Sequence, residues 1–325
     1  MCNSNLNKAK NAKQDEFYTK YEDIEKELTN YKNNFRNKII YCNCDNPLES
    51  NFFKYFANNF ESLELKKLIS TYYSSGKVNP NMLEINNVKG YDGSIKSLLK
   101  NNENISRPLA GNGDFRSKEC VDILSNNKDL IVVTNPPFSL FREFVNLLIE
   151  NNTKFLIIGS QNALKYKEIF PLIKEEKIWL GVNNGSQEFM VPKTYDGTIT
   201  RIDETGNRWV KLGNIAWYTN LKFKRKGNEM ELSLKYKDGL KNGLYPKYKD
   251  YDAIDVSKVS DIPLDYDKEM GVPISYMTKH NPKLFEIIGE LNHGCDNIYD
   301  FARPIVNSVE KFPRIIIKRR TEYGL

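Results

Sequence analysis

The stretch DLIVVTNPPF, at positions 129–138, decides the fold. Its first half is a continuous apolar run, which is typical of a strand buried on both faces of a parallel sheet. Asn135, Pro136 and Pro137 are turn residues that end this strand. Residues 139–149 then carry apolar side chains at three- and four-residue spacing, as an amphipathic helix does. The sequence therefore predicts a buried strand that passes directly into a helix.

Strand and helix patterns alternate on both sides of this stretch. Helical patterns lie between apolar, strand-like runs at 38–42, 67–73, 129–134, 155–159 and 178–182, and they cover 21–35, 50–60, 117–124, 139–149 and 163–174. This alternation predicts an α/β fold with a doubly wound, mostly parallel sheet, whose ligands bind at the carboxyl ends of the strands. Turn signals at 195–197 and 205–207 predict that residues 189–221 form antiparallel hairpins completing the sheet.

The composition and periodicity of the sequence change at residue 222. Residues 222–267 are rich in Lys, Tyr, Asp and Gly and have weak periodicity, and the run KFPRIIIKRR at 311–320 is apolar and basic. A chain of 325 residues exceeds one ordinary domain. We therefore predict a larger domain at 1–221 and a smaller C-terminal region at 222–325.

Composition limits the class of protein. A net charge of +6 and a pI near 8.8 are compatible with a nucleic-acid partner but do not establish one. The chain has no apolar run of 18 residues, and its opening segment has no hydrophobic stretch, so we predict a soluble, cytoplasmic protein. Because only two histidines accompany five irregularly spaced cysteines, we predict no bound metal and free thiols at Cys2, Cys42, Cys44, Cys120 and Cys295.

The tetrad Asn135 to Phe138 fits the activation of a planar amino group. The lone pair of the N6 amine of adenine is delocalised into the ring, so two acceptors must engage its protons before it becomes nucleophilic. The side-chain oxygen of Asn135 and the carbonyl of Pro136 are such acceptors, and the prolines, including Pro137, fix the backbone that aims them. Phe138 offers a face on which the base stacks, and a duplex base would have to flip out to reach it. The alternative is a plain turn that ends a strand.

At these residues the chain resembles the adenine-N6 DNA methyltransferases of the EcoRI modification methylase type. Besides the tetrad, the resemblance is carried by DEFYT at 15–19, IIYCNCDNP at 39–47, FFKYFA at 52–57, GDFRS at 113–117 and IPLDYDKEMGVPI at 262–274. It implies a Rossmann-like fold, the cofactor S-adenosylmethionine and double-stranded DNA as substrate. It further implies the site GAATTC, a cognate restriction endonuclease as functional partner, and a monomer.

The resemblance also implies cofactor-binding residues. DEFYT contributes Asp15, Phe17, Tyr18 and Thr19, and GDFRS contributes Asp114, which accepts from the adenine amino group of the cofactor, with Phe115 beside that ring. Read alone, both segments are also compatible with the start of a helix.

Two strand ends depart from the pattern usual in methyltransferases. The first strand ends in Asn43, Cys44 and Asp45 where a glycine-rich turn is usual, so Asn43 and Asp45 are cofactor contacts or a plain turn. The second strand ends in Tyr72 and Tyr73 instead of the acid that holds the ribose, which leaves the ribose contact unassigned.

Basic residues near the predicted boundary and in the C-terminal region are candidates for phosphate contact, although most charged clusters are simply solvated faces. These candidates are Lys222, Lys224, Arg225, Lys226, Lys247, Lys249, Lys318, Arg319 and Arg320. The residues that read bases are not identifiable from the sequence.

Two other functions compete with DNA methylation. Methyltransferases that act on RNA bases or on a protein glutamine also use an Asn-Pro-Pro-aromatic site, since each must activate a planar amino group. A nuclease or non-catalytic DNA-binding partner is the second alternative, because Glu175, Glu176 and Lys177 form a fragment of a metal-dependent nuclease motif.

Overall fold

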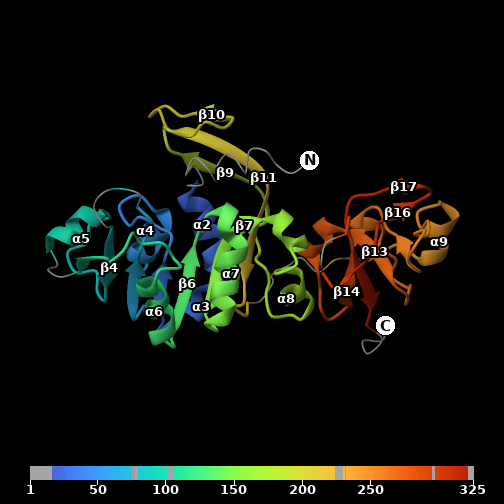
Figure 1. The fold of residues 1–325 in the computed structure, drawn as a ribbon, viewed down its shortest axis with the longest axis horizontal. Helices are drawn as coiled ribbons and strands as arrows, with labels where there is room; N and C mark the ends of the chain where they lie inside the picture. Colours follow the sequence, from blue (N-terminus) through green and yellow to red (C-terminus); the bar gives the residue numbers. More distant parts are fainter. Residues whose placement is uncertain are drawn as a thin grey trace. The chain divides into compact units, whose positions relative to one another are not determined.

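The computed structural model describes residues 17–74, 76, 80–101, 105–223, 230, 232–294 and 297–320. They form two compact units (Figure 1). Unit 1 is drawn from Met1–Ala163 and Trp179–Lys224, and unit 2 from Leu164–Ile178 and Arg225–Leu325. The boundary between the units thus falls close to residue 222. Leu164–Ile178, however, groups with unit 2, although the sequence analysis places it in the domain at 1–221.

Unit 1 is built on a mixed sheet that has eleven strands in the described part of the chain. Its main order is β1 (Tyr18–Thr19), β9 (Gly185–Val191), β11 (Arg208–Thr219), β7 (Lys154–Ser160), β6 (Leu130–Thr134), β2 (Ile39–Cys42), β3 (Lys67–Ser70), β4 (Asn81–Ile85) and β5 (Ser106–Pro108). Strands β8 (Trp179–Leu180) and β10 (Arg201–Ile202) pair with β11. The four central strands β3, β2, β6 and β7 are parallel, and the pairings outside them are antiparallel.

Both faces of the parallel centre are apolar, because successive side chains of a strand point to opposite faces. One face packs on the helices α2 (Tyr21–Leu28), α3 (Lys32–Phe35) and α4 (Asn51–Asn58), which share one core with Ile40, Val133 and Ile158. The other face meets α6 (Lys118–Asn126) and α7 (Phe141–Glu150): a Cβ added to Gly159 of β7 would lie 2.4 Å from the Phe141 ring. Helices on two faces explain why the central strands read as continuous apolar runs.

The structure confirms the central strands and most of the predicted helices, but it differs at the edges of the sheet. The run at 178–182 is not a parallel strand: β8 is two residues long and pairs antiparallel with β11. Helix α5 (Ile95–Asn101) and the strands β4 and β5 were not predicted. The helix expected at 163–174 is split into the 3-10 turn η3 (Gln161–Lys165) and the short helix α8 (Phe170–Lys174). Helix α8 has Pro171 in its first turn.

Unit 2 contains two further sheets. The larger one has the order β12 (Ile254–Asp255), β13 (Met270–Pro273), β18 (Arg314–Arg319), β14 (Phe285–Leu291) and β15 (Asp300–Ala302). The hairpin of β16 (Ile305–Val306) and β17 (Val309–Glu310) and the helix α9 (Tyr236–Lys241) complete the unit. Inside the larger sheet, the Nε of Arg314 lies 2.8 Å from Oδ1 of Asp255, which also accepts from the Tyr248 hydroxyl at 2.6 Å. Among the described residues, none of the helices has the length and apolar character needed to cross a lipid bilayer.

Candidate active site

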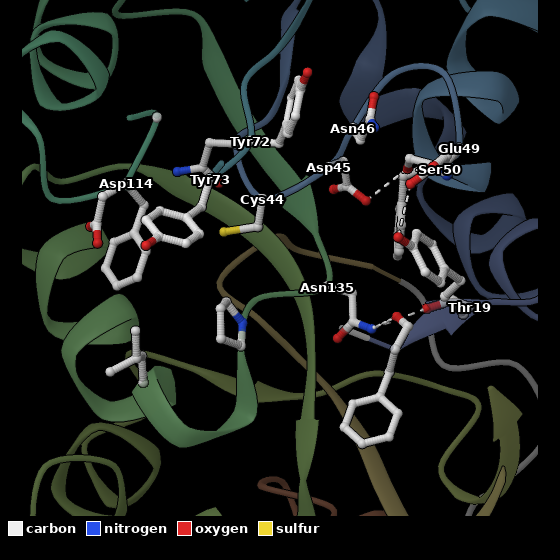
Figure 2. Close-up of a pocket in the computed structure, with 18 of the residues that line it drawn as sticks. Thr19, Cys44, Asp45, Asn46, Glu49, Ser50, Tyr72, Tyr73, Asp114 and Asn135 are labelled. Carbon is white, nitrogen blue, oxygen red and sulfur yellow. Dashed lines mark hydrogen bonds between the residues drawn. The ribbon is translucent and has the colours of Figure 1, made fainter. Parts of the chain in front are cut away.

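The carboxyl ends of the central strands of unit 1 surround a cavity of about 510 Å³, drawn in Figure 2. A cavity of this size falls in the range of sites for cofactor-sized molecules. Its walls come from the loops after β2, β3 and β6, from β1, and from the turn before α6. Those strand ends meet because parallel strands present their carboxyl ends at one edge of the sheet.

Asn135 directly follows strand β6, and its side-chain amide is held in one orientation. Its Nδ2 donates to the carbonyl of Phe17 at 2.6 Å and lies 3.4 Å from Oγ1 of Thr19. A carbonyl oxygen only accepts, so this contact assigns the amide nitrogen to that side and leaves Oδ1 on the other. Oδ1 is buried and has no hydrogen-bond partner among the residues that the structure describes. Since an unpaired buried acceptor costs roughly 1–3 kcal/mol, the geometry indicates a donor from a ligand.

The rest of the tetrad divides between the cavity and the core. Pro137 lines the cavity with Asn135, whereas Pro136 is buried. Phe138 is half-buried and stacks on Phe17, with 5.5 Å between ring centroids and 27° between ring planes. Phe17, directly before β1, thus lies against the tetrad and supports both the Asn135 amide and the Phe138 ring.

Asn43 and Asp45 also line the cavity, at the end of β2. Asn43 is 1% exposed, and neither its Nδ2 nor its Oδ1 has a hydrogen-bond partner within the described ranges. Asp45 accepts from Ser50 Oγ at 2.7 Å and from the hydroxyl of Thr134. Burial raises the pKa of the Asp45 carboxyl to about 6, although both hydroxyl bonds act to lower it.

The turn before α6 brings Asp114 to the opposite side of the cavity (Figure 2). Its carboxylate forms an ion pair with Arg116 at 2.7 Å, and this partner lowers the pKa of Asp114. Oδ1 of Asp114 accepts twice from Arg116, whereas Oδ2 accepts once and retains a lone pair for a ligand donor. Phe115 lines the cavity and packs edge-on against Phe144 in the core, at 5.0 Å between centroids.

Several cavity residues were not singled out from the sequence. Tyr72 and Tyr73, whose strand end left the ribose contact open, both lie in the wall, as does Cys44. Glu49 lies there too, and its Oε2 accepts from the Tyr18 hydroxyl at 2.8 Å. The added members of the lining, beyond these, are Asn46, Ser50, Asn51, Phe52, Asn112, Gly113, Arg116, Ser139 and Leu140. Phe17, Tyr18 and Thr19 are cavity residues as expected, whereas Asp15 lies outside the described residues.

The basic candidates for DNA contact lie outside this cavity wherever the structure describes them. Lys222 is exposed in unit 1, and Lys224, Arg225 and Lys226 lie outside the described residues. In unit 2, Lys247 and Lys249 are exposed, and Lys247 pairs with Asp252 at 3.1 Å.

The C-terminal basic run has internal partners in unit 2. Lys318 and Arg319 are half-buried in β18, and Arg319 donates to the carbonyl of Leu264. Arg320 pairs with Glu176 at 3.0 Å. Cys42, Cys44 and Cys120 are free thiols in unit 1, while Cys2 and Cys295 lie outside the described residues.

Comparison of the sequence with known proteins agrees with the geometry of the site. The sequence profile of the family described as "Adenine-specific methyltransferase EcoRI" matches residues 5–320. The chain belongs to this family. The chain is 46% identical over 326 residues to the Escherichia coli protein named type II methyltransferase M.EcoRI, covering 98% of this chain and 97% of that protein. It is 41% identical over 291 residues to type II methyltransferase M.MpnI of Mycoplasma pneumoniae, covering 87% and 84%.

A third member, type II methyltransferase M.MgeORF184P of Mycoplasma genitalium, is 38% identical over 288 residues, covering 87% of this chain and 85% of that protein. No solved structure matches the sequence. Membership of the EcoRI family confirms that the chain is an adenine-specific DNA methyltransferase, and it favours DNA over the RNA-base and glutamine alternatives.

The nuclease alternative also loses its sequence motif. Glu175 and Glu176 follow helix α8 and pair with Lys177 at 2.7 Å and with Arg320 at 3.0 Å. Across the described ranges, three or more His, Cys, Asp or Glu side chains are nowhere grouped as metal ligands would be. The fragment is therefore a turn with two ion pairs.

Proposed function

We propose that this chain methylates the N6 amine of an adenine in double-stranded DNA, with S-adenosylmethionine as methyl donor. The observation that carries the proposal is the Asn135 amide, whose Nδ2 is anchored on Phe17 while its buried Oδ1 has no partner among the described residues. An anchored acceptor at the rim of a cofactor-sized cavity is what an N6 amine requires.

Two acceptors act on the amine. Oδ1 of Asn135 accepts one N6 proton, and the main-chain carbonyl of Pro136 accepts the other, which draws the nitrogen toward sp3 geometry and frees its lone pair. Both acceptors need little reorganisation, because the Phe17 contact holds the amide and the proline rings hold the backbone. Phe138, supported by Phe17, supplies the aromatic face for a flipped base.

The residues of the cavity fit the cofactor. S-adenosylmethionine supplies an electrophilic methyl group when it is bound. Asn43 carries a buried donor and acceptor that lack partners in the described residues, and Oδ2 of Asp114 retains an acceptor lone pair for an adenine amino group. Tyr72 and Tyr73 offer aromatic and hydroxyl groups near the ribose position that the sequence left open. The parallel centre of unit 1, with helices on both faces, supports the assignment of a Rossmann-like cofactor domain.

The biological setting follows from the relatives. Because they are named type II methyltransferases, we propose that the chain protects host DNA from a cognate restriction endonuclease. GAATTC is the proposed target, by analogy with M.EcoRI, and we propose that a cytoplasmic monomer acts on it. The C-terminal unit is proposed to recognise the duplex, with Lys247, Lys249 and the basic run from Lys318 as candidate phosphate contacts, to which Lys222 of unit 1 adds a further one.

The test is transfer of labelled methyl from S-adenosylmethionine to duplex DNA, followed by identification of the labelled nucleoside. Asn135→Ala should bind the cofactor nearly as well as the wild type and lose most turnover, by roughly a hundredfold or more. Asn33→Ala, an exposed position on α3, is the matched control and should behave as wild type. Label in a product other than N6-methyladenine would contradict the proposal, and equal loss of cofactor binding would make Asn135 structural.

A further inference from the structure

The carboxylate of Asp45 connects two parts of the site that are far apart in the sequence. Oδ1 accepts from the hydroxyl of Ser50, the N-cap of α4, at 2.7 Å, and Oδ2 accepts from the hydroxyl of Thr134. Thr134 is the last residue of β6 and immediately precedes Asn135. The Asp45 side chain is 8% exposed and Thr134 is fully buried, so water does not compete for these bonds.

The Asp45 backbone is fixed as well. Its N–H donates to the carbonyl of Thr71 at 3.1 Å, and its own carbonyl accepts from the Ser70 hydroxyl. Three strand ends therefore converge on one residue: β2 carries it, β3 holds its main chain, and β6 is held by its side chain. Figure 2 shows Asp45 and Ser50 facing one another on the side of the pocket opposite Asp114.

We propose that Asp45 is a positioning residue that sets the place of Asn135 by holding the Thr134 hydroxyl at the end of β6. This role rests on the proposed function, and it goes beyond a cofactor contact. Thr134 is outside the cavity lining found in the described residues, so its hydroxyl does not contact the cofactor directly, and we assign its effect on catalysis to the position of Asn135.

The charge state of Asp45 decides whether both bonds form. An ionised carboxylate accepts from both hydroxyls, whereas a protonated one carries a proton that it must donate. Ser50 Oγ already accepts from the N–H groups of Phe52 and Phe53, so a proton aimed at it competes with the helix cap. Protonation of Asp45 therefore weakens either the cap of α4 or the hold on β6.

The groups around Asp45 do not obscure the titration of its carboxyl. On its own segment, burial keeps the pKa values of Cys42 and Cys44 well above the usual thiol range, so both are neutral near pH 6. The partners from β3, α4 and β6 are hydroxyl or backbone groups, and Glu49, between β2 and α4, contacts Tyr18. The pKa of Asp45, at about 6, therefore predicts an acidic limb in the pH profile of kcat/KM, which reports the titration of the free enzyme, with kcat/KM falling as the pH drops below about 6.

The experiment compares kcat, the pH profile of kcat/KM and the cofactor Kd in full-length variants. Thr134→Val should lower kcat at pH 8 by roughly tenfold to a hundredfold, because small displacements at a reacting centre cost that much. The cofactor Kd should change little. Loss of a bond that lowers the pKa of Asp45 should also move the acidic limb upward by roughly one pH unit.

Controls separate positioning from folding. Thr134→Ser restores the hydroxyl and should recover most of kcat and the position of the limb. Thr219→Val removes another fully buried hydroxyl, which donates to Phe155 at 2.6 Å, and should lower stability without moving the limb. Ser50→Ala removes the second bond to Asp45 and should move the limb in the same direction even if Thr134→Val does not fold.

Each outcome is decisive. An acidic limb that stays in place in Thr134→Val or Ser50→Ala, or a Thr134→Ser protein as impaired as Thr134→Val, would overturn the inference. Absence of N6 transfer by the wild type would instead overturn the proposed function. Wild-type transfer with an unmoved limb in the variants would overturn the inference alone.

Discussion

Gly113 shows how a single residue shapes the cofactor wall. Its backbone has a φ of 75°, in the left-handed region, and a Cβ built on it would lie 1.9 Å from the carbonyl oxygen of Tyr72. A backbone atom cannot move aside as the end of a flexible side chain can. Glycine therefore lets the turn before α6 approach the end of β3, with Asp114 next in the chain.

Gly113→Ala should consequently damage cofactor binding. We expect the cofactor Kd to rise at least tenfold and the free energy of unfolding to fall by about 1–3 kcal/mol, because the strained turn must shift away from Tyr72. Gly111→Ala is the matched control, since a Cβ there meets no atom within 4 Å. Calorimetric titration of both variants with S-adenosylmethionine measures the difference, and equal affinities would show that the close approach is not needed.

At the residue scale, the sequence marks a cavity residue where one short segment carries its own geometry. Asn135 and Asp114 each combine a strand or helix boundary with a chemically fitting side chain, and both line the cavity. Tyr73 and Glu49 were missed because nothing in their own segments marks them. They reach the cavity through the packing of the loops after β3 and β2, which is a tertiary effect.

At the scale of secondary-structure elements, Glu27 joins helix α2 to the turn between β8 and β9. It is fully buried on α2, where Oε1 accepts from the Tyr31 hydroxyl and Val182 N–H, and Oε2 accepts twice from Asn183. The turn between β8 and β9 is thereby fixed to the helix. A Cβ at Gly181 would clash with Oε1 at 2.2 Å, so this turn also needs glycine to approach.

Glu27→Gln should destabilise the protein by about 2–4 kcal/mol. An amide has only one acceptor oxygen, so its NH2 group must face at least one N–H donor that becomes unpaired in the core. Glu22→Gln, on the exposed side of α2, should change the free energy of unfolding by less than about 0.5 kcal/mol. Urea unfolding followed by circular dichroism compares them, and similar midpoints would refute the role of Glu27 as a buried connector.

The predictability of each element follows its burial. Strands β2, β6 and β7 are covered on both faces, and their continuous apolar runs were recognised. Strand β5 is short, largely exposed and ends in Pro108, so it carries no such signal. In β18 the sequence analysis selected Lys318 and Arg319 but not Arg314, which is buried against Asp255, because a paired charge inside a sheet is not recognisable from composition.

At the scale of the whole molecule, the proposed catalytic residues and most of the proposed DNA-contacting basic residues belong to different units. The cavity, the tetrad and the carboxylate link through Asp45 all belong to unit 1. Most described basic candidates for DNA contact belong to unit 2, where Lys247 and Lys249 stand exposed beside the buried rings of Tyr245 and Tyr248. Tyr245 and Tyr248 are therefore core residues, whereas Lys247 and Lys249 are accessible to a phosphate.

This arrangement predicts that affinity for DNA and methyl transfer respond to different substitutions. If Lys247 and Lys249 each contact a phosphate, their joint replacement by Ala should reduce the slope of log K against log salt concentration by about two. Binding should weaken equally for target and unrelated duplexes, because phosphate contacts carry no sequence information. At saturating DNA, kcat should stay within about twofold of the wild type, since neither residue lines the cavity of unit 1.

Lys118→Ala is the matched control, because Lys118 is an exposed lysine of α6 whose side chain is 87% accessible and pairs with Asp122. Fluorescence anisotropy across a salt series measures all three proteins. A slope unchanged in the Lys247→Ala/Lys249→Ala protein would identify the pair as a solvated face, and duplex contact would then have to be sought elsewhere on the chain. A slope reduced in Lys118→Ala would place α6 against the duplex, where we assign no phosphate contact.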